Sequence, residues 1–351
     1  MTYSKESEEI FMNTKRIFLP IGLLYGAITS LRNFFFRVKI LKKYQPSVFT
    51  LSVGNLQIGG TGKTPHVEYF IDFFKNEEIA VLSRGYGRKT TGFLKADKKS
   101  TPQTIGDEPF QIHNKYADSV NVYVCEDRPK GVLEIMKIRK PTVILLDDAF
   151  QHQYISPHLN LLLTTYQQPF TRDEMLPVGR LREFKENANR ADGIIVTKCP
   201  EEIDAKNKGF IISEIKKFVD NDKPVFFSRF SYQNTIGYNN QLFDLNVETV
   251  LISGIAKPEL FEEYANKTFS VSEMYRFNDH YHFTTKSIDD IIAVHGKAQY
   301  LTTEKDFVKI KNIIPDEFRN SFYYLPIKVS FEKENEFNDF ILTSFALYKS
   351  S

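Results

Sequence analysis

The sequence has no tryptophan and only two cysteines in 351 residues. Because Cys125 and Cys199 each end an apolar, strand-like run, we expect reduced core thiols of a cytoplasmic protein, and their spacing suggests no zinc site. An excess of one charge is also lacking. The 46 basic and 44 acidic residues leave a net charge of +2, which gives no general reason to expect nucleic acid as a partner.

Long hydrophobic runs are absent as well. The apolar run at residues 17–28 covers 12 positions, whereas a transmembrane helix needs about 20. No small-residue cleavage site marks this run as a signal peptide. What remains is an ordinary globular composition, with 42% hydrophobic and 26% charged residues, in a chain long enough for about two domains.

A glycine-rich stretch lies between an apolar run, Val48–Val53, and a helix-like run at residues 66–75. Strand, glycine turn, Lys-Thr and helix are the layout of a phosphate-binding loop, in which backbone amides and a helix N-terminus bind one anion. We expect Lys63 to reach the β- and γ-phosphates of a nucleotide and Thr64 to ligate Mg²⁺. The residues expected to hold the nucleotide are Gln57, Ile58, Gly59, Gly60, Thr61, Gly62, Lys63 and Thr64.

One position departs from the strict motif. Gln57 stands where G-x-x-x-x-G-K-[ST] has its first glycine. The alternative is a glycine turn that carries Lys-Thr by chance. The flanking strand and helix are what the motif requires, so they favour the phosphate loop.

Strand-like runs alternate with helical patterns from residue 48 to about 222, which predicts a parallel sheet covered on both faces. A polar boundary near residue 222 precedes a smaller α/β set. The expected fold class is therefore α/β: a P-loop NTPase-like, mostly parallel sheet covered by helices, a second smaller α/β lobe and an N-terminal amphipathic helix. The expected divisions are 1–45 for that helix, 46–222 for the nucleotide-binding and catalytic lobe, and 223–351 for a smaller lobe that closes over the cleft.

Two carboxylates, Asp147 and Asp148, end the apolar run that begins at Val143. In a P-loop enzyme this is the expected place for the acid that holds Mg²⁺. Adjacent residues of an extended strand point to opposite faces, so both acids can reach the metal only if the chain turns here. A solvated strand end is the alternative. Gln151 follows at the same edge of the sheet.

Several other polar groups follow strands or begin helices, and each has a structural alternative. Arginines in a glycine turn suit phosphate, and an acid at a helix start is often only a cap. A histidine beside an acid in a polar loop can tune a catalytic carboxylate. The positions singled out are Arg84 in a glycine turn, Asp107 and Glu108 at a helix start, Arg128 after a strand, Arg182 and Glu183 in a charged loop, and Asp279 with His280.

The N-terminal segment has a helical apolar stripe that includes Leu24, Ile28, Leu31 and Phe34. Basic residues surround this stripe. A basic amphipathic helix of this kind fits the interface of an anionic membrane. The alternative is a helix that packs its stripe on its own protein, and the aromatic cluster Phe34–Phe36 favours the membrane slightly because three neighbouring residues cannot share one narrow face.

These motifs together resemble the tetraacyldisaccharide 4′-kinase (LpxK) family of lipid A biosynthesis. The matching segments run in family order through nearly the whole chain: LPIGLLY (19–25), VGNLQIGGTGKTP (53–65), SRGYG (83–87), GDEP (106–109), DDAFQH (147–152), LPVGRLRE (176–183), GIAKP (254–258), Asp279-His280 and TEKD (303–306). The chain departs from the usual pattern at Ala149, where glycine is common, and at Arg180 and Phe184, where prolines are common.

The resemblance implies ATP- and Mg²⁺-dependent phosphorylation of the 4′-hydroxyl of a tetraacylated glucosamine disaccharide-1-phosphate, giving lipid IVA. It implies Asp107 paired with His280 as the base, with Lys63 and Asp148 as further catalytic residues. Thr64, Asp147, Asp148 and Glu108 are implied at the metal. Arg84, Arg128, Gln151, Arg182 and Glu183 are implied around the substrate cleft.

The resemblance also implies work at the cytoplasmic face of the inner membrane of a Gram-negative bacterium, with the N-terminal helix on the bilayer. The expected partners are ATP, the lipid A disaccharide precursor and the membrane surface, without nucleic acid or an obligate protein partner. Proline at position 200, where GTPases carry the guanine-reading acid after Thr197-Lys198, favours ATP over GTP. The alternatives are a P-loop kinase or ATPase for a soluble metabolite, and a non-catalytic nucleotide-dependent membrane switch.

Overall fold

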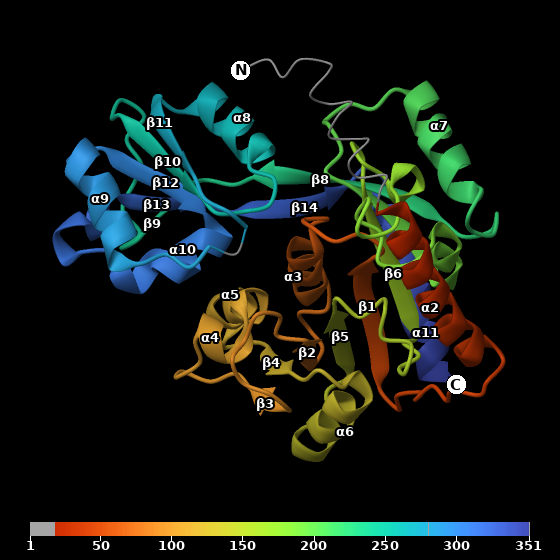
Figure 1. The fold of residues 1–351 in the computed structure, drawn as a ribbon. Coiled ribbons are helices and arrows are strands. Elements are labelled where there is room, and N and C mark those ends of the chain that lie inside the picture. The colour runs from red at the N-terminus through yellow and green to blue at the C-terminus, as the bar shows by residue number, and fades with distance from the viewer. Residues whose placement is uncertain (1–17, 280, 351) are drawn as a thin grey trace. The chain divides into compact units, whose positions relative to one another are not determined.

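The computed structural model describes residues 18–279 and 281–350 (Figure 1). The chain forms two compact units, each built from separate stretches of sequence. Unit 1 comprises residues 1–67, 128–229 and 330–351, and unit 2 comprises residues 68–127 and 230–329. These units do not follow the sequential boundaries predicted near residues 45 and 222, because residues 68–127 pack with the second lobe and the C-terminal helix packs with the first.

Unit 1 contains a parallel sheet whose central strands are continuously apolar. The strands are β1 (Phe49–Asn55), β5 (Val143–Asp147), β6 (Leu159–Thr165), β7 (Gly193–Thr197), β8 (Val225–Tyr232) and β14 (Ile327–Phe331), the last two of which extend past the unit boundary. Their order is β14-β8-β7-β6-β1-β5, and the pairs β5–β1, β1–β6, β6–β7 and β7–β8 are parallel. Every residue of β1, β5 and β7 is buried, as expected for strands covered on both faces.

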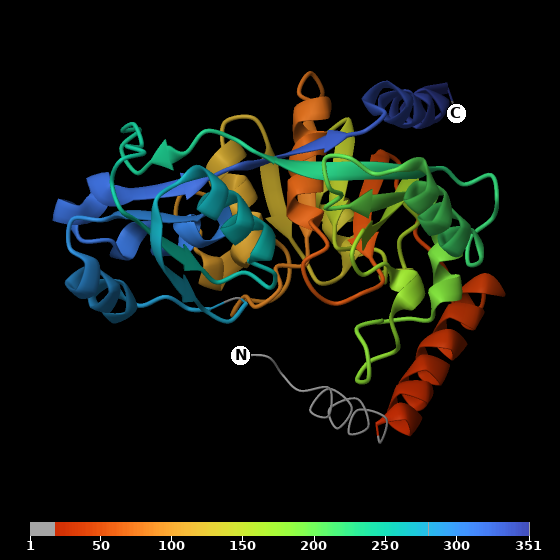
Figure 2. The ribbon, with the colours of Figure 1, turned by 90° about the horizontal axis from the view of Figure 1, so that it is seen from above.

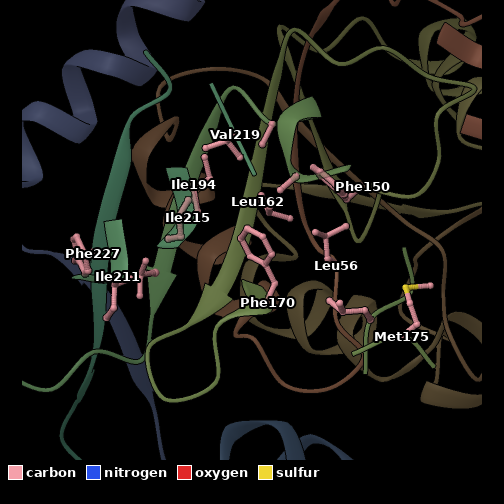
Figure 3. Packing of buried hydrophobic residues seen from close by; sticks show 14 residues of the cluster. Leu56, Phe150, Leu162, Phe170, Met175, Ile194, Ile211, Ile215, Val219 and Phe227 are labelled. Atoms are coloured by element: carbon pink, nitrogen blue, oxygen red, sulfur yellow. The ribbon is translucent and has the colours of Figure 1, made fainter. Parts of the chain in front are cut away.

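Helices cover both faces of this sheet. The helical elements of unit 1 are α2 (Leu19–Arg37), the start of α3 (Lys63–Phe73), α6 (Arg128–Ile138), α7 (Ala205–Lys216), α11 (Glu334–Ser350) and the 3₁₀ helices η1 (Phe170–Arg172) and η2 (Lys185–Arg190). Phe227 packs with Ile211 of α7 in one apolar cluster (Figure 3). Its neighbour Phe226 lies 4.9 Å from the ring of Phe337 in α11. Since adjacent strand residues point to opposite faces, α7 and α11 cover different faces of β8.

Unit 2 has two groups of strands. β2 (Ile79–Ser83) pairs parallel with β4 (Asn121–Val124), which pairs antiparallel with β3 (Leu94–Lys95). A five-stranded sheet has the order β11-β10-β12-β13-β9, parallel except for β9. Its strands are β9 (Ile236–Gly237), β10 (Thr249–Ser253), β11 (Val271–Arg276), β12 (Gln299–Thr303) and β13 (Phe322–Leu325).

The five-stranded sheet also has apolar residues packed on both faces. Val250 and Ile252 belong to one buried cluster, and Leu251 between them belongs to another. The helical elements of unit 2 are α4 (Pro102–Ile105), α5 (Asp107–Tyr116), α8 (Glu259–Thr268), α9 (Thr285–His295), α10 (Glu304–Ile310), η3 (Lys311–Ile313) and η4 (Asp316–Ser321). The predicted α/β class, with a large mostly parallel sheet and a second smaller one, is thus confirmed.

Helix α2 has an unusual distribution of side chains. Its buried positions are small or polar, with Phe36 as the large exception: Gly22, Gly26, Thr29, Asn33 and Phe36. The predicted apolar stripe is exposed instead, at 63% for Leu24, 61% for Ile28 and 56% for Leu31. The alternative in which the helix packs this stripe on its own protein is therefore not what the structure shows.

Two further sequence expectations concern thiols and membrane-spanning segments. Cys125 is buried and Cys199 partly buried, and both are reduced thiols. Within residues 18–279 and 281–350, none of the helices combines the length and apolarity needed to cross a bilayer.

In unit 1, α2 and α11 lie on opposite sides of the sheet (Figure 2).

Candidate active site

The predicted phosphate-binding loop connects β1 to α3. β1 ends at Asn55, and α3 begins at Lys63, so Lys63 and Thr64 occupy the first turn of the helix. Gly59 and Gly62 have φ values of 102° and 88°, which only glycine adopts without strain. The Asn55 side chain donates across the loop to Thr61 Oγ1 at 2.7 Å. This strand–loop–helix geometry orients amides and a helix N-terminus for an anion.

Gln57 explains how the loop forms without its first glycine. Its side chain is buried, and Nε2 donates to Asp173 Oδ2 at 2.7 Å and to the Gln168 carbonyl at 3.2 Å. The next amide, of Ile58, donates to the Arg180 carbonyl at 2.8 Å. Since Gln57 is not among the residues with positive φ, a glycine is not needed there. Its side chain anchors the loop to the protein interior, and only its main chain is available to phosphate.

The two acids after β5 occupy a sharp turn. Asp147 is the last strand residue, and Asp148 has a φ of 48°, in the left-handed region that aspartate tolerates better than most residues. Asp147 is 3% exposed, whereas the Asp148 side chain is 33% exposed. The chain therefore makes the turn that both acids would need in order to reach one metal ion. Asp148 is the acid directed to the phosphate loop. Ala149, where the family resemblance implied glycine, does not have positive φ.

Asp148 lies between two cations. Its Oδ1 is 3.8 Å from Lys63 Nζ and 3.0 Å from Arg182 Nη2, while Arg182 Nη1 donates to Oδ2 at 3.3 Å. Burial by itself would raise the pKa of Asp148, but Lys63 and Arg182 outweigh it and hold this pKa well below its ordinary range. Asp148 therefore remains an anion at any physiological pH.

Three of the predicted cleft residues support the same turn. Arg182 Nη2 also donates to the Asn55 carbonyl at 2.9 Å, and Gln151 Nε2 donates to that carbonyl at 2.7 Å. Arg128 is fully buried and donates from Nη2 to the carbonyls of Asp147 and Asp148 at 3.2 and 3.4 Å. Arg128 was expected at the substrate cleft. The structure places it behind the acids, where it braces their backbone.

Glu183 is also an interior residue, at 1% exposure. It accepts from Asn33 Nδ2 at 2.9 Å and from Arg190 Nη1 at 2.7 Å. Neither partner was singled out from the sequence, because Asn33 is 150 positions away and a carboxylate in a charged loop suggests a surface residue. Its position in the interior fits a supporting role better than the predicted contact with substrate.

The remaining predicted residues lie in unit 2. Asp107 and Glu108 begin α5, and their carboxylates meet lysines of α10: Asp107 Oδ2 is 3.1 Å from Lys309 Nζ, and Glu108 Oε1 is 3.4 Å from Lys305 Nζ. Lys305 is also 3.4 Å from Asp279 Oδ1. Burial opposes its charge, but Glu108 and Asp279 raise the pKa of Lys305 overall. The lysines were missed, although their i,i+4 spacing in the helix that begins within TEKD was a signal.

Arg84 and His280 are the two remaining predicted residues. Arg84 is exposed in the turn after β2, next to Gly85, whose φ of 71° and close approach to the Ile105 carbonyl leave no room for a side chain. His280, the expected partner of Asp107, lies outside the residues that the structure describes.

A cavity of about 420 Å³ lies beyond the carboxyl end of β7, beside the middle of β8. His66 of α3 connects it to the phosphate loop: Nδ1 donates to the Gly62 carbonyl at 2.7 Å, and Nε2 accepts from the Ser228 hydroxyl at 3.0 Å. This volume suits part of a small ligand. The cavity is lined by Cys199, Pro200, Glu201, Glu202, Ile203, Asp204, Phe227, Ser228, Arg229 and Glu332.

The oxygen atoms near the loop suit a hard cation. Among the described residues, no cluster of three or more His, Cys, Asp or Glu side chains is arranged to hold a metal by itself. Mg²⁺ usually takes only one or two protein oxygens, with phosphates and water completing its shell. A hydroxyl at Thr64 and a permanently ionised carboxylate at Asp148, on either side of Lys63, match that requirement.

Comparisons with known proteins agree with this geometry. Residues 14–346 match the family described as tetraacyldisaccharide-1-P 4′-kinase. The chain is 39% identical over 335 residues to the tetraacyldisaccharide 4′-kinase of Flavobacterium psychrophilum, covering 93% of this chain and 96% of the relative. It is 35% identical to that of Bacteroides thetaiotaomicron over 95% and 94% of the two chains. The crystal structure of LpxK from Aquifex aeolicus in complex with ATP aligns with a TM-score of 0.76 and 29% identity, covering 95% and 99% of the two chains.

Proposed function

This chain belongs to the tetraacyldisaccharide-1-phosphate 4′-kinase (LpxK) family, and we propose that it works at a membrane surface, using Mg²⁺-ATP to phosphorylate the 4′-hydroxyl of a tetraacylated glucosamine disaccharide-1-phosphate. It is a phosphotransferase with an alcohol acceptor, and it binds ATP. The observation that carries the proposal is the placement of Asp148 between Lys63 and Arg182 at the phosphate loop.

Phosphoryl transfer depends mainly on positioning and on charge stabilisation. In this proposal the loop amides and Lys63 hold the β- and γ-phosphates, and Thr64 and Asp148 hold Mg²⁺, with Asp147 behind them. The metal neutralises charge on the transferred phosphoryl group. Arg182 keeps Asp148 in place through paired hydrogen bonds. The adenine ring is assigned to the 420 Å³ cavity beside His66.

The acceptor hydroxyl needs a group that takes its proton. We assign that role to Asp107, with His280 as its partner and Glu108 nearby, in line with the family resemblance. The 4′-oxygen forms a bond to the γ-phosphorus as its proton passes to the Asp107 carboxylate, and the bond from the γ-phosphorus to the β–γ bridging oxygen breaks to release ADP. Lys309 Nζ lies 3.1 Å from Asp107 Oδ2 and helps to hold this carboxylate in position.

A substrate with four acyl chains stays in the bilayer, because each buried CH₂ contributes about 0.8 kcal/mol. Helix α2 supplies a means of reaching it. Its exposed Leu24, Ile28 and Leu31 suit the acyl region, and Arg37 with the lysines that follow suits anionic headgroups. We therefore assign the protein to the cytoplasmic face of the inner membrane of a Gram-negative bacterium, without an obligate protein partner.

The test is a transfer assay with the full-length protein. It contains radiolabelled ATP, Mg²⁺ and tetraacyl disaccharide-1-phosphate in detergent micelles, and its product is resolved by thin-layer chromatography. Labelled lipid that depends on protein and on Mg²⁺ is expected, and Asp107→Ala should abolish transfer while ATP binding survives. Folded protein that binds ATP but labels no lipid would overturn the proposal and would favour a soluble acceptor or a nucleotide-dependent switch.

A further inference from the structure

Helix α2 is attached to the protein by a narrow face of small and polar residues. Gly22, Gly26, Thr29 and Asn33 recur at intervals of three or four, so they lie on one side of the helix. A Cβ at Gly26 would come within 2.4 Å of the Phe184 ring, and one at Gly22 within 3.1 Å of the Leu176 carbonyl. The helix therefore packs closely on the loop that contains Arg182 and Glu183.

Asn33 is the polar centre of this contact. It is 6% exposed, and its Nδ2 donates to Glu183 Oε2 at 2.9 Å and to Asn187 Oδ1 at 2.9 Å, while its Oδ1 accepts from Gln153. Both ends of the amide are therefore engaged. A buried amide with this many partners fixes one arrangement of the groups around it.

Glu183 is a buried carboxylate whose charge is balanced from two directions. Arg190 Nη1 lies 2.7 Å from Oε2, and Arg32 Nη2 of α2 lies 3.4 Å from Oε1. A buried carboxylate needs such partners, because an unpaired charge in the interior is costly. Since Glu183 accepts from Asn33 and from both arginines, its position depends on the position of α2.

The network continues into both loops of the candidate site. Arg182, the residue before Glu183, holds Asp148 and the Asn55 carbonyl. On the other side, Arg190 Nη2 donates to the Phe150 carbonyl at 3.1 Å, and Arg32 Nη2 lies 3.4 Å from the Gln151 carbonyl. The polar face of α2 is thereby connected to the segment that carries Asp147 and Asp148.

We propose that Asn33 is a positioning residue for phosphoryl transfer: through Glu183 it fixes Arg182, and through Arg182 it fixes the Asp148 carboxylate that meets the metal. The inference rests on the proposed function and deepens it, because it gives α2 a second task beside membrane contact. The apolar face of the helix contacts the membrane, and its polar face fixes the positions of the residues at the phosphotransfer site.

The two tasks have different kinetic consequences. Removing the Asn33 amide leaves the ion pair between Glu183 and Arg190 in place but frees the loop of Arg182, so Mg²⁺-ATP is held less well for transfer. Small displacements at a reacting centre reduce rate strongly. We expect Asn33→Ala to lower kcat by roughly tenfold or more in micelles with saturating lipid, while binding to anionic vesicles remains at the wild-type level.

Matched variants separate this effect from a general loss of packing. Thr29→Ala alters the same buried face of α2, where the Thr29 hydroxyl donates to the Gly26 carbonyl within the helix itself, and should leave kcat near wild type. Leu24→Ser with Ile28→Ser alters the exposed face, and should weaken vesicle binding and raise KM for vesicle-bound lipid. Thermal melting of each protein reports the folded fraction.

Glu183→Gln provides a second measurement if Asn33→Ala fails to fold, because it keeps the shape of the side chain and removes its charge. Folded Glu183→Gln with wild-type kcat would overturn the inference, as would folded Asn33→Ala with wild-type kcat or with a loss no larger than that of Thr29→Ala. A fall in kcat at unchanged vesicle binding supports it.

A calorimetric titration needs no acceptor and separates this inference from the proposed function. Wild-type protein should bind ATP more tightly with Mg²⁺ than with EDTA. In Asn33→Ala the ratio of these two affinities should be several-fold smaller. If wild type bound Mg²⁺-ATP but labelled no lipid, the proposed acceptor would be wrong and the titration would still decide the role of Asn33. An equal increase in ATP affinity on replacing EDTA with Mg²⁺ in both proteins would contradict the inference.

Discussion

Lys63 Nζ lies 3.8 Å from Asp148 Oδ1, which joins the first residue of α3 to the residue that follows β5. The two residues are 85 positions apart in the sequence. The parallel pairing of β1 with β5 nevertheless brings the ends of the strands that precede them to one edge of the sheet. In the proposed function this contact is where the triphosphate and its metal meet the protein. It also keeps Asp148 ionised.

Asp148→Asn should lower kcat about a hundredfold or more, because it removes a preorganised charge from the place where Mg²⁺ and the transferred phosphoryl group meet. The side chain keeps its size, and the Lys63 and Arg182 side chains are each 21% exposed to solvent, so the protein should fold. Steady-state kinetics at saturating ATP and lipid measure the effect. Asp97→Asn, an exposed position in unit 2, is the control, and an Asp148→Asn enzyme within threefold of wild type would contradict this role.

Gln57→Gly should destabilise the protein, although it restores the strict motif. It removes two hydrogen bonds to Asp173 and Gln168, which costs about 1–3 kcal/mol, and adds flexibility to the unfolded chain. Urea denaturation at neutral pH measures the free energy of unfolding. Burial would raise the pKa of Asp173 and the Gln57 hydrogen bond helps to lower it, so Gln57→Glu should be worse still. A variant with glycine that is more stable than wild type would show that the anchor is unimportant.

Gly26→Ala should reduce the free energy of unfolding by about 1–2 kcal/mol, because the new methyl group meets the Phe184 ring at 2.4–2.6 Å in the wild-type geometry. Phe184→Leu in the same protein should recover much of this loss, since the smaller side chain makes room. A double-mutant cycle by thermal or urea unfolding gives the coupling energy. Additive effects of the two substitutions would mean that the ring moves aside freely.

Leu24→Ser with Ile28→Ser should change the free energy of unfolding by less than about 0.5 kcal/mol per site, because exposed positions contribute little to folding. Binding to anionic vesicles should fall more than about tenfold, since each leucine-sized side chain gains about 1.5–3 kcal/mol when buried in an apolar phase. Co-sedimentation measures this. Leu347→Ser, at an exposed position of α11, should leave vesicle binding unchanged, and an equal loss there would indicate non-specific adsorption.

His66 should make the protein less stable in mild acid. Burial lowers its pKa to about 4 in the folded protein, against about 6.5 in the unfolded chain. Above pH 6.5 the ring is neutral in both states. Between pH 6.5 and 4 only the unfolded chain takes up the proton, so the free energy of unfolding falls as the pH falls, by up to about 3 kcal/mol from this residue.

The measurement is urea unfolding of wild type and His66→Gln from pH 8 to pH 4. The difference in stability between the two proteins should shrink as the pH falls below 6.5, because the variant lacks the titrating ring. A difference that is constant over this range would mean that His66 takes up its proton equally in both states.

Much of the fold was predictable because the central strands of a covered parallel sheet are continuous apolar runs. The predicted run at 48–53 begins within one residue of the start of β1 (Phe49–Asn55), and the apolar run that begins at Val143 and ends in the two acids is β5 (Val143–Asp147), with Asp148 just after it. The phosphate loop was predictable for a similar reason, since its residues are consecutive and its glycines have a local conformational role.

The supporting residues were not predictable in the same way. The family resemblance implied Glu183 and Arg128 at the cleft, whereas both are buried, and their burial depends on partners that only folding supplies. Asn33 with Glu183, and Lys309 with Asp107, are each joined by tertiary contact across long stretches of chain. The sequence also could not show whether the apolar stripe of α2 is buried or exposed, because periodicity shows that a helix has an apolar stripe and not what covers it.

The small residues at Gly22 and Gly26 have one more consequence. They bring α2 into close contact with the loop ending in Phe184, and such dense packing opposes independent movement of helix and loop. If the helix lies on the bilayer as proposed, this packing sets the height of the phosphate loop above the headgroups. An acceptor whose sugar projects by that height would meet the site while its chains remain in the bilayer, and a longer or shorter headgroup would not.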